Sequence, residues 1–194
     1  MKYIKSLCLG AAMALGSVNA AGAVTIFSAN LTEAQEVAAP TPLGASGSAT
    51  LVLNNAMTRL EMTIQLFGLD LDGMQTVSTD DNVSAMHIHA APAGVNGGVV
   101  FGLISPNNDL NGDLMIDPVA GLISSAWDVG EGNAGTDLAL QLGNLFAEGL
   151  YFNVHTPVSP AGQIRGQIAA VSEPATLGLL AGGLALAGFV RRRA

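Results

Sequence analysis

Three histidines are the residues of this chain best suited to metal chemistry, and they occur in two short alternating segments. His87 and His89 are two positions apart, so in a strand they share one face, while Met86 and Ile88 share the other. His155 lies in a second alternating segment further along the chain. Imidazole is a good ligand for copper and zinc, and strands hold their side chains rigidly. We therefore predict a metal site made of His87, His89 and His155, with copper or zinc as the metal.

A structural interpretation of the same residues stays open. Histidines on a sheet face often act only as polar side chains that hydrogen-bond to their neighbours, here to one another and to Asn153. The sequence offers no serine or cysteine nucleophile arranged with a histidine and an acid, no phosphate-binding loop and no nucleotide-binding fingerprint. We therefore expect a binding or structural role, and leave open whether the chain is an enzyme.

Arg165 lies in the alternating segment 163–168, close in sequence to the third histidine, which places its guanidinium on a polar strand face. There it could bind an anionic or carboxylate ligand, with Asn153 as a second polar contact. The alternative is a salt bridge with an acidic side chain of a loop, such as Glu33 or Glu36. The sequence favours the salt bridge.

A polar loop that follows the segment 98–104 resembles the first half of a calcium-binding loop. Oxygen-bearing side chains alternate there, and Gly112 occupies the sixth position. The twelfth position holds Pro118, where such loops carry a bidentate glutamate, so a solvated loop without calcium is favoured. The calcium ligands of the alternative hypothesis are Asn107, Asp109, Asn111 and Asp113.

Short strands separated by turn residues must position these side chains. The eight predicted strands are 24–31, 48–53, 60–67, the segment that carries His87 and His89, 98–104, 122–128, 151–156 and 163–168. One short helix is predicted from Leu138, with Thr136 as its N-cap. The pattern predicts an all-β fold, a Greek-key β-sandwich or flattened barrel of about eight strands with one short helix.

Two separated segments also carry a family resemblance. They read AMHIHAAPAGVNGGVV and GLYFNVHTPVSPAGQIRGQI, and they follow LTEAQEVAAP and GSATLVL in the order expected. Together they resemble the CHRD domain, a module first described in chordin and common in bacterial secreted proteins. The resemblance covers roughly 24–171. It implies a secreted β domain with a binding or structural role.

The order of these motifs is also similar to that of Cu/Zn superoxide dismutase, which has an H-x-H strand, a later V-H strand and a terminal strand with arginine. This similarity implies His87, His89 and His155 as copper ligands and Arg165 as the group that draws an anion toward the metal. The chain has no further histidine for a metal-bridging position or a zinc loop. A copper-dependent, superoxide-dismutase-like redox enzyme is the alternative function.

The segment 1–23 has the pattern of a secretory signal peptide. Lys2 and Lys5 precede an apolar run over 7–16, and small residues follow it. The one cysteine, Cys8, lies within this segment. We therefore expect export of a cysteine-free domain over 24–171, without disulfides or thiolate ligands.

The segment 172–194 resembles a PEP-CTERM sorting signal. It contains a short proline motif, an apolar run over 177–190 that predicts a transmembrane helix, and a basic cluster. By the positive-inside rule the basic cluster should stay on the cytoplasmic side of the membrane. The resemblance implies an inner-membrane-anchored precursor, cut by an exosortase-type enzyme and released to the cell surface or extracellular matrix of a Gram-negative bacterium. A plain C-terminal anchor is the alternative. The sorting residues are Ser172, Glu173, Pro174, Arg191, Arg192 and Arg193.

Charge narrows the range of partners. The segment 24–171 carries fourteen acidic side chains against two basic ones, Arg59 and Arg165. Such a surface repels phosphate backbones, which excludes nucleic acid as a partner. We expect partners in an exopolysaccharide matrix or among surface proteins.

Overall fold

The computed structural model describes residues 24–171. The predicted signal peptide over 1–23 and the predicted sorting signal over 172–194, with its proline motif and arginines, lie outside the described residues. Within the described part of the chain, no helix is both long enough and apolar enough to cross a membrane.

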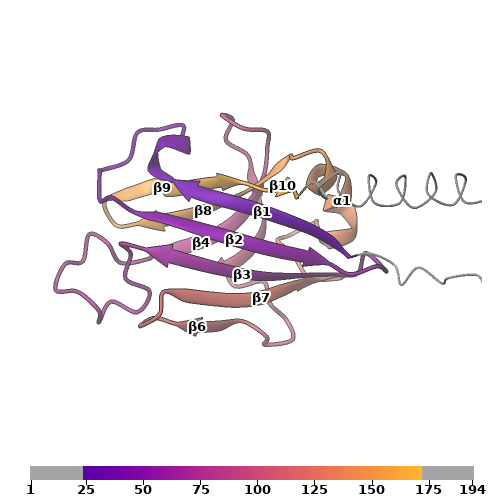
Figure 1. Ribbon diagram of the computed structural model, residues 1–194, viewed down its shortest axis with the longest axis horizontal. Helices are drawn as coiled ribbons and strands as arrows, with labels where there is room; N and C mark the ends of the chain where they lie inside the picture. The colour runs from indigo at the N-terminus through magenta and orange to yellow at the C-terminus, as the bar shows by residue number, and fades with distance from the viewer. Residues whose placement is uncertain (1–23, 172–194) are drawn as a thin grey trace, which may run out of the picture.

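Ten strands form one antiparallel sheet that curls into a half-barrel (Figure 1). The sheet order is β5-β4-β8-β9-β1-β2-β3-β7-β6, and β10 pairs with β1. The strands are β1 (Thr25–Thr32), β2 (Ser46–Leu53), β3 (Arg59–Phe67), β4 (Ala85–Ala90), β5 (Gly98–Ile104), β6 (Met115–Asp117), β7 (Leu122–Asp128), β8 (Leu150–Thr156), β9 (Ser159–Gln167) and β10 (Ala169–Ala170).

The all-β prediction is confirmed, and each of the eight predicted strands has a counterpart. The two additional strands, β6 and β10, have three and two residues, which is too short to show an alternating pattern. The β9 strand also begins earlier than predicted, at Ser159 rather than at Gln163.

The core follows from alternation along the strands. In β3, Leu60, Met62, Ile64 and Leu66 are buried, and the residues between them are polar. Trp127 of β7 is fully buried and stacks on Phe101 of β5, with ring centroids 5.1 Å apart. Burying a large apolar side chain contributes about 2 kcal/mol. Apolar residues from strands far apart in the sheet order thus share one core.

One helix, α1 (Leu138–Phe146), packs against this core, and a short 3-10 helix, η1 (Glu33–Gln35), follows β1. Leu138 and Leu145 of α1 are fully buried. The predicted N-cap, Thr136, is wrong by one residue: the Asp137 side chain accepts a hydrogen bond from Leu140 N at 2.9 Å. Aspartate is at least as good an N-cap as threonine, so both residue types fit the signal.

The β4, β8 and β9 strands are buried on both faces. Their apolar residues, such as Met86 and Phe152, belong to the core. Their other face is polar and is buried as well: η1 lies against β9, and the backbone at Ser105 and Gly97 contacts the histidines of β4. The buried polar residues on this face are His87, His89, Asn153, Gln163 and Arg165.

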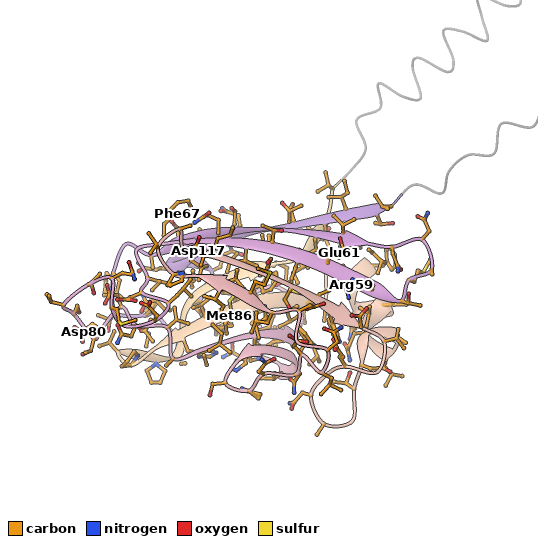
Figure 2. All side chains as sticks on the ribbon, turned by 90° about the horizontal axis from the view of Figure 1, so that it is seen from below. Arg59, Glu61, Phe67, Asp80, Met86 and Asp117 are labelled. Carbon is orange, nitrogen blue, oxygen red and sulfur yellow. The ribbon has the colours of Figure 1, made fainter. Side chains whose placement is uncertain are left out.

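The outward-facing side of β3 also carries polar residues, but these are exposed to solvent, unlike the buried polar face. Arg59 lies next to Glu61 on this side of β3 (Figure 2). Met86 of β4, by contrast, lies inside the molecule and is fully buried. Arg59 forms ion pairs with Glu61, Asp113 and Asp128. One arginine of the domain is therefore surrounded by carboxylates and remains partly exposed to solvent.

Candidate metal centre

Two neighbouring strands bring the three histidines together. His87 and His89 lie on β4, and His155 lies on β8. The two strands pair antiparallel, with His87 opposite Asn153 and His89 opposite Tyr151. Residues on one strand face that are directly opposite have their Cβ atoms about 5 Å apart. Asn153 is therefore a neighbour of His87 across the strands and of His155 along β8.

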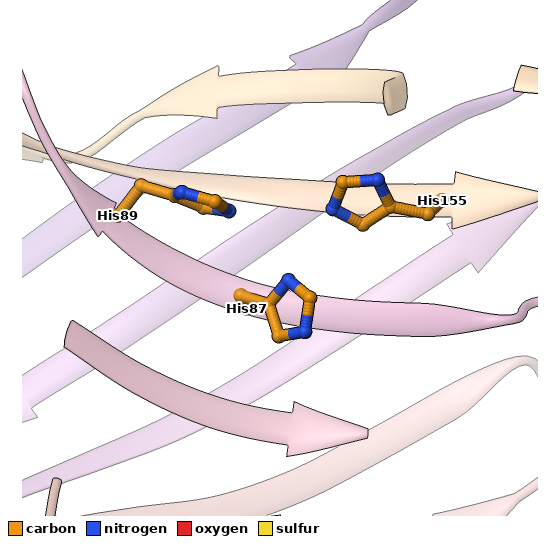
Figure 3. A group of neighbouring side chains, drawn as sticks. All are labelled: His87, His89 and His155. Atoms are coloured by element: carbon orange, nitrogen blue, oxygen red, sulfur yellow. The ribbon is translucent and has the colours of Figure 1, made fainter. Parts of the chain in front are cut away.

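The imidazoles converge as the strand pattern predicted (Figure 3). The His87 ring centroid lies 5.1 Å from that of His155 and 5.5 Å from that of His89, and the remaining pair is 6.2 Å apart. One nitrogen from each ring lies within 4.8 Å of the other two. The group could therefore hold a metal ion.

The second nitrogen of each ring fixes which atom faces the centre. Each donates its hydrogen to a backbone carbonyl, because a carbonyl oxygen can only accept. The pairs are His87 Nε2 to Ser105 O at 2.8 Å, His89 Nδ1 to Gly97 O at 3.0 Å, and His155 Nδ1 to Pro160 O at 3.1 Å.

The remaining nitrogens, His87 Nδ1, His89 Nε2 and His155 Nε2, therefore carry lone pairs. All three are buried and have no hydrogen-bond partner. A buried polar atom left without a partner costs about 1–3 kcal/mol. Metal-binding histidines show this pattern, with one nitrogen on a carbonyl and the other on the metal. The structural alternative, in which the imidazoles hydrogen-bond to one another and to Asn153, does not occur.

Gly97 supports two members of the site at once. Its carbonyl accepts from His89, and its N–H donates to the Tyr151 hydroxyl oxygen at 3.1 Å. A Cβ atom at this position would lie 2.0 Å from the carbonyl oxygen of Ala90. Only glycine fits this close approach. No pattern in the sequence indicates that Gly97 orients His89, because the contact runs through its backbone carbonyl.

Tyr151 is a further residue that strand patterns did not single out. Its ring is nearly parallel to that of His89, at an interplanar angle of 10° and a centroid distance of 5.0 Å. The guanidinium carbon of Arg165 lies 3.4 Å from the centroid of the same ring. Tyr151 thus holds both the histidine and the arginine by stacking.

The electrostatics of the site favour the neutral form of His89 and His155. Burial, with smaller contributions from His87, His155 and Arg165, lowers the pKa of His89 to about 4, and the hydrogen bond to Gly97 acts in the opposite direction. Burial and His87 also lower the pKa of His155. Neutral imidazoles at pH 7 are the form that binds metals.

Arg165 is 1% exposed, and the predicted salt bridge with Glu33 or Glu36 is absent. In the described part of the chain, no carboxylate oxygen lies within 4.0 Å of its guanidinium. Glu33 is unavailable because its Oε1 accepts hydrogen bonds from Leu43 N, Ala45 N and Gln163 Nε2. The guanidinium instead contacts neutral oxygens: Pro92 O at 3.0 Å, Asn96 Oδ1 at 3.4 Å and Gln167 Oε1 at 3.5 Å.

Glu36 and Asn153 meet at Gly162. Glu36 Oε1 and Asn153 Oδ1 are buried without hydrogen-bond partners, and each lies 2.5 Å from where a Cβ on Gly162 would be. The backbone φ of Gly162 is 137°, which also favours glycine. Burial raises the pKa of Glu36 to about 7, although Arg165 acts to lower it. Two oxygen acceptors therefore lie on the polar face beside the histidines.

The loop over 107–113, the candidate for calcium, uses its oxygens for hydrogen bonds within the protein, as expected for the favoured loop without calcium. Asp109 accepts hydrogen bonds from the backbone N–H groups of Asn111, Gly112 and Leu114. Burial acts to raise the pKa of Asp109, but these bonds outweigh it and lower the pKa. The other loop oxygens also have partners: Asn107 Oδ1 accepts from Asp109 N, Asn111 Oδ1 accepts from Asp113 N, and Asp113 accepts from Arg59 and Ala126 N.

Comparison with known proteins identifies one family match. A family model described as the CHRD domain matches residues 27–168, which span nearly all of the sheet. No curated protein and no solved structure matches the chain.

Proposed function

The chain belongs to the CHRD domain family, and from this premise we propose that it is an exported domain with a binding or structural role that holds a copper or zinc ion. The observation that carries the metal is the trio of buried nitrogen lone pairs on His87, His89 and His155. Nothing else within the described residues offers them a hydrogen.

The ligand type supports copper or zinc over harder cations. Imidazole nitrogens suit copper and zinc, whereas calcium and magnesium select oxygen ligands. Three protein ligands leave a coordination position for water or a further ligand. The lone-pair atoms are fixed by strands and by backbone carbonyls, so little reorganisation is needed on binding.

The location proposed for this domain is the cell surface or extracellular matrix of a Gram-negative bacterium. The signal-like segment 1–23 and the sorting-like segment 172–194 support this proposal, with an exosortase-type enzyme and the inner membrane as transient partners. The excess of acidic side chains suits a secreted protein in contact with exopolysaccharide or surface proteins. Replacement of Glu173 and Pro174 should leave the protein in the inner membrane; unchanged release would contradict sorting.

A calorimetric titration tests the metal proposal. The purified chain, freed of metal, should bind one equivalent of Zn²⁺ or Cu²⁺, and His155→Ala should weaken binding by more than the roughly 10–100-fold that loss of a supporting group costs. Thr50→Ala, on the exposed face of β2, serves as the matched control and should bind as the wild type does. Equal binding by His155→Ala and Thr50→Ala would refute the site.

A copper-dependent redox enzyme of the superoxide dismutase type is the second candidate. The stacking of Arg165 and His89 on one tyrosine favours it, since a guanidinium near the metal would attract an anion. If this function holds, the copper-loaded chain consumes superoxide catalytically, and Arg165→Gln slows it while copper stays bound. Stoichiometric copper binding without turnover of superoxide would rule out the redox enzyme and leave only the binding role.

A further inference from the structure

A cavity of about 410 Å³ lies on the polar side of β9, apart from the three histidines. Its walls are the segment 34–37, which contains the end of η1, and the turn residues Ala93 and Gly94 that follow β4. Arg165 and Gln167 of β9 complete the lining. The volume lies in the range of small-molecule sites.

Arg165 gives this cavity a positive charge that forms no direct ion pair within the described residues, although it acts at longer range on Glu36 in the same lining. The guanidinium is buried, yet its hydrogen-bond partners in the described chain are neutral oxygens and its ring contact is Tyr151. Buried charges in proteins are normally paired. Arg59, which is far more exposed, has three carboxylates around it. The more buried arginine therefore has no carboxylate partner within residues 24–171, which leaves its positive charge available to an anionic ligand.

Hydrogen-bond acceptors surround the same cavity. Gln35 Oε1 and Gln167 Oε1 each take part in a single long contact, of 3.4 Å and 3.5 Å, so both can accept a stronger one. Glu36 lines the cavity too, but its Oε1 is buried beside Asn153 and is closed to a ligand, so only its other carboxylate oxygen is a candidate acceptor. These oxygens suit the hydroxyl groups of a ligand. Ala34, Val37 and Ala93 offer apolar surface for its C–H groups.

We propose that the cavity binds an acidic sugar, with the ligand carboxylate paired to Arg165 and its hydroxyls donating to the glutamine and glutamate oxygens around it. One guanidinium matches one carboxylate through two parallel hydrogen bonds. A phosphate dianion would meet a single cation among several acceptors, which fits it less well. This inference goes beyond the metal proposal and does not depend on it.

Glu36 sets the conditions under which such a ligand binds. An ionised Glu36 would repel the ligand carboxylate, but burial raises its pKa to about 7, with Arg165 acting in the opposite direction. Its carboxyl group is therefore partly protonated near neutral pH. Glu36→Gln removes the repulsion and keeps a hydrogen-bonding oxygen, so it should bind the ligand at least as tightly as the wild type does.

The test titrates the metal-free chain with glucuronate, glucose, acetate and inorganic phosphate. Glucuronate should bind roughly tenfold or more tightly than glucose, which lacks the carboxylate, and than acetate, which lacks the hydroxyls. Equal affinity for glucuronate and glucose would overturn the role of Arg165. Equal affinity for glucuronate, acetate and phosphate would overturn sugar recognition in favour of a general anion site. No binding of glucuronate would overturn the proposal entirely.

Two variants locate the binding. Arg165→Gln should abolish glucuronate binding, and Ala93→Leu, in an exposed turn, should do the same by filling the cavity. A denaturant melt of Ala93→Leu reports on its fold independently of any metal. Glucuronate binding by Ala93→Leu at wild-type strength would exclude this cavity. A chain that binds glucuronate but no metal would refute the metal proposal and leave this one standing.

Discussion

The histidine centre and the loop over 107–113 both have the spacing of metal ligands, but they differ in whether the candidate ligand atoms already have hydrogen-bond partners. In the histidine centre, each ring commits one nitrogen to a backbone carbonyl and leaves the other without a partner. In the loop, the carboxylate of Asp109 accepts three backbone N–H groups. Ligand spacing alone therefore does not distinguish the two regions, whereas buried lone pairs without a hydrogen-bond partner do.

Burial explains why the two regions differ. The loop is largely exposed, so its polar groups can satisfy one another or water at little cost. His87 and His89, by contrast, are only 7% and 9% exposed. A buried lone pair without a partner is unfavourable, and a metal ion at this point would remove the penalty of all three nitrogens together.

Among changes outside the three ligands, Gly97→Ala is expected to damage the histidine centre most. Its Cβ would overlap the carbonyl oxygen of Ala90, and the loop that orients His89 would have to move. We expect a loss of about 1–3 kcal/mol in the free energy of unfolding. Metal affinity should fall roughly 10–100-fold. Denaturant melts and zinc titrations measure both.

Gly98→Ala is the matched control for that variant, because no atom lies within 4 Å of its Cβ position. It should bind zinc as the wild type does. If Gly97→Ala also bound zinc normally, the backbone carbonyl would not be what holds His89 in place, and the contrast with the loop would lose its explanation.

Much of the centre could be predicted from sequence, and its decisive feature could not. The two-residue spacing of His87 and His89, with His155 on a similar strand, correctly indicated a shared face. The carbonyl partners at Ser105, Gly97 and Pro160 could not be foreseen, because they depend on loop conformations that carry no side-chain pattern.

Arg165 is a second case in which polar contacts could not be predicted from the sequence. A salt bridge to Glu33 or Glu36 was a reasonable expectation from charge alone. The structure instead commits Glu33 to backbone N–H groups and stacks Arg165 on Tyr151. The fold class could be predicted because alternation reports on burial directly, whereas pairing among polar groups depends on which strands become neighbours.

Acid should weaken the histidine centre before it affects the loop. The pKa of His89 falls from 6.5 in the unfolded chain to about 4 in the fold, so the unfolded state binds more protons between these values. Its contribution to stability is complete above pH 6.5 and is lost as the pH falls toward 4. The loss should reach up to about 3 kcal/mol.

This pH dependence is best measured in a Glu36→Gln background, because Glu36 acts in the opposite direction. Its pKa rises from 4.5 to about 7, so its contribution is complete below pH 4.5 and is lost as the pH rises through 7. Adding His89→Gln should flatten the curve of unfolding free energy between pH 6.5 and pH 4. An unchanged slope would show that His89 is not the titrating group.

Asp109→Ala should have the smallest effect. It removes the acceptor for three backbone N–H groups on the surface, and a cost of about 1–2 kcal/mol is expected because water replaces part of what is lost. Thermal melts with and without millimolar Ca²⁺ measure it, and we expect the same loss in both. A melting temperature that rises with Ca²⁺ in the wild type, and no longer rises in Asp109→Ala, would instead establish a calcium site in the loop.

A crystal structure of the zinc-loaded chain, with the metal located by its anomalous scattering, tests the central claim most directly. The account predicts one zinc ion bonded at about 2.0–2.1 Å to His87 Nδ1, His89 Nε2 and His155 Nε2, with the other three ring nitrogens still on their carbonyls. Zinc bound through His87 Nε2, or found at the 107–113 loop with the histidines empty, would contradict it.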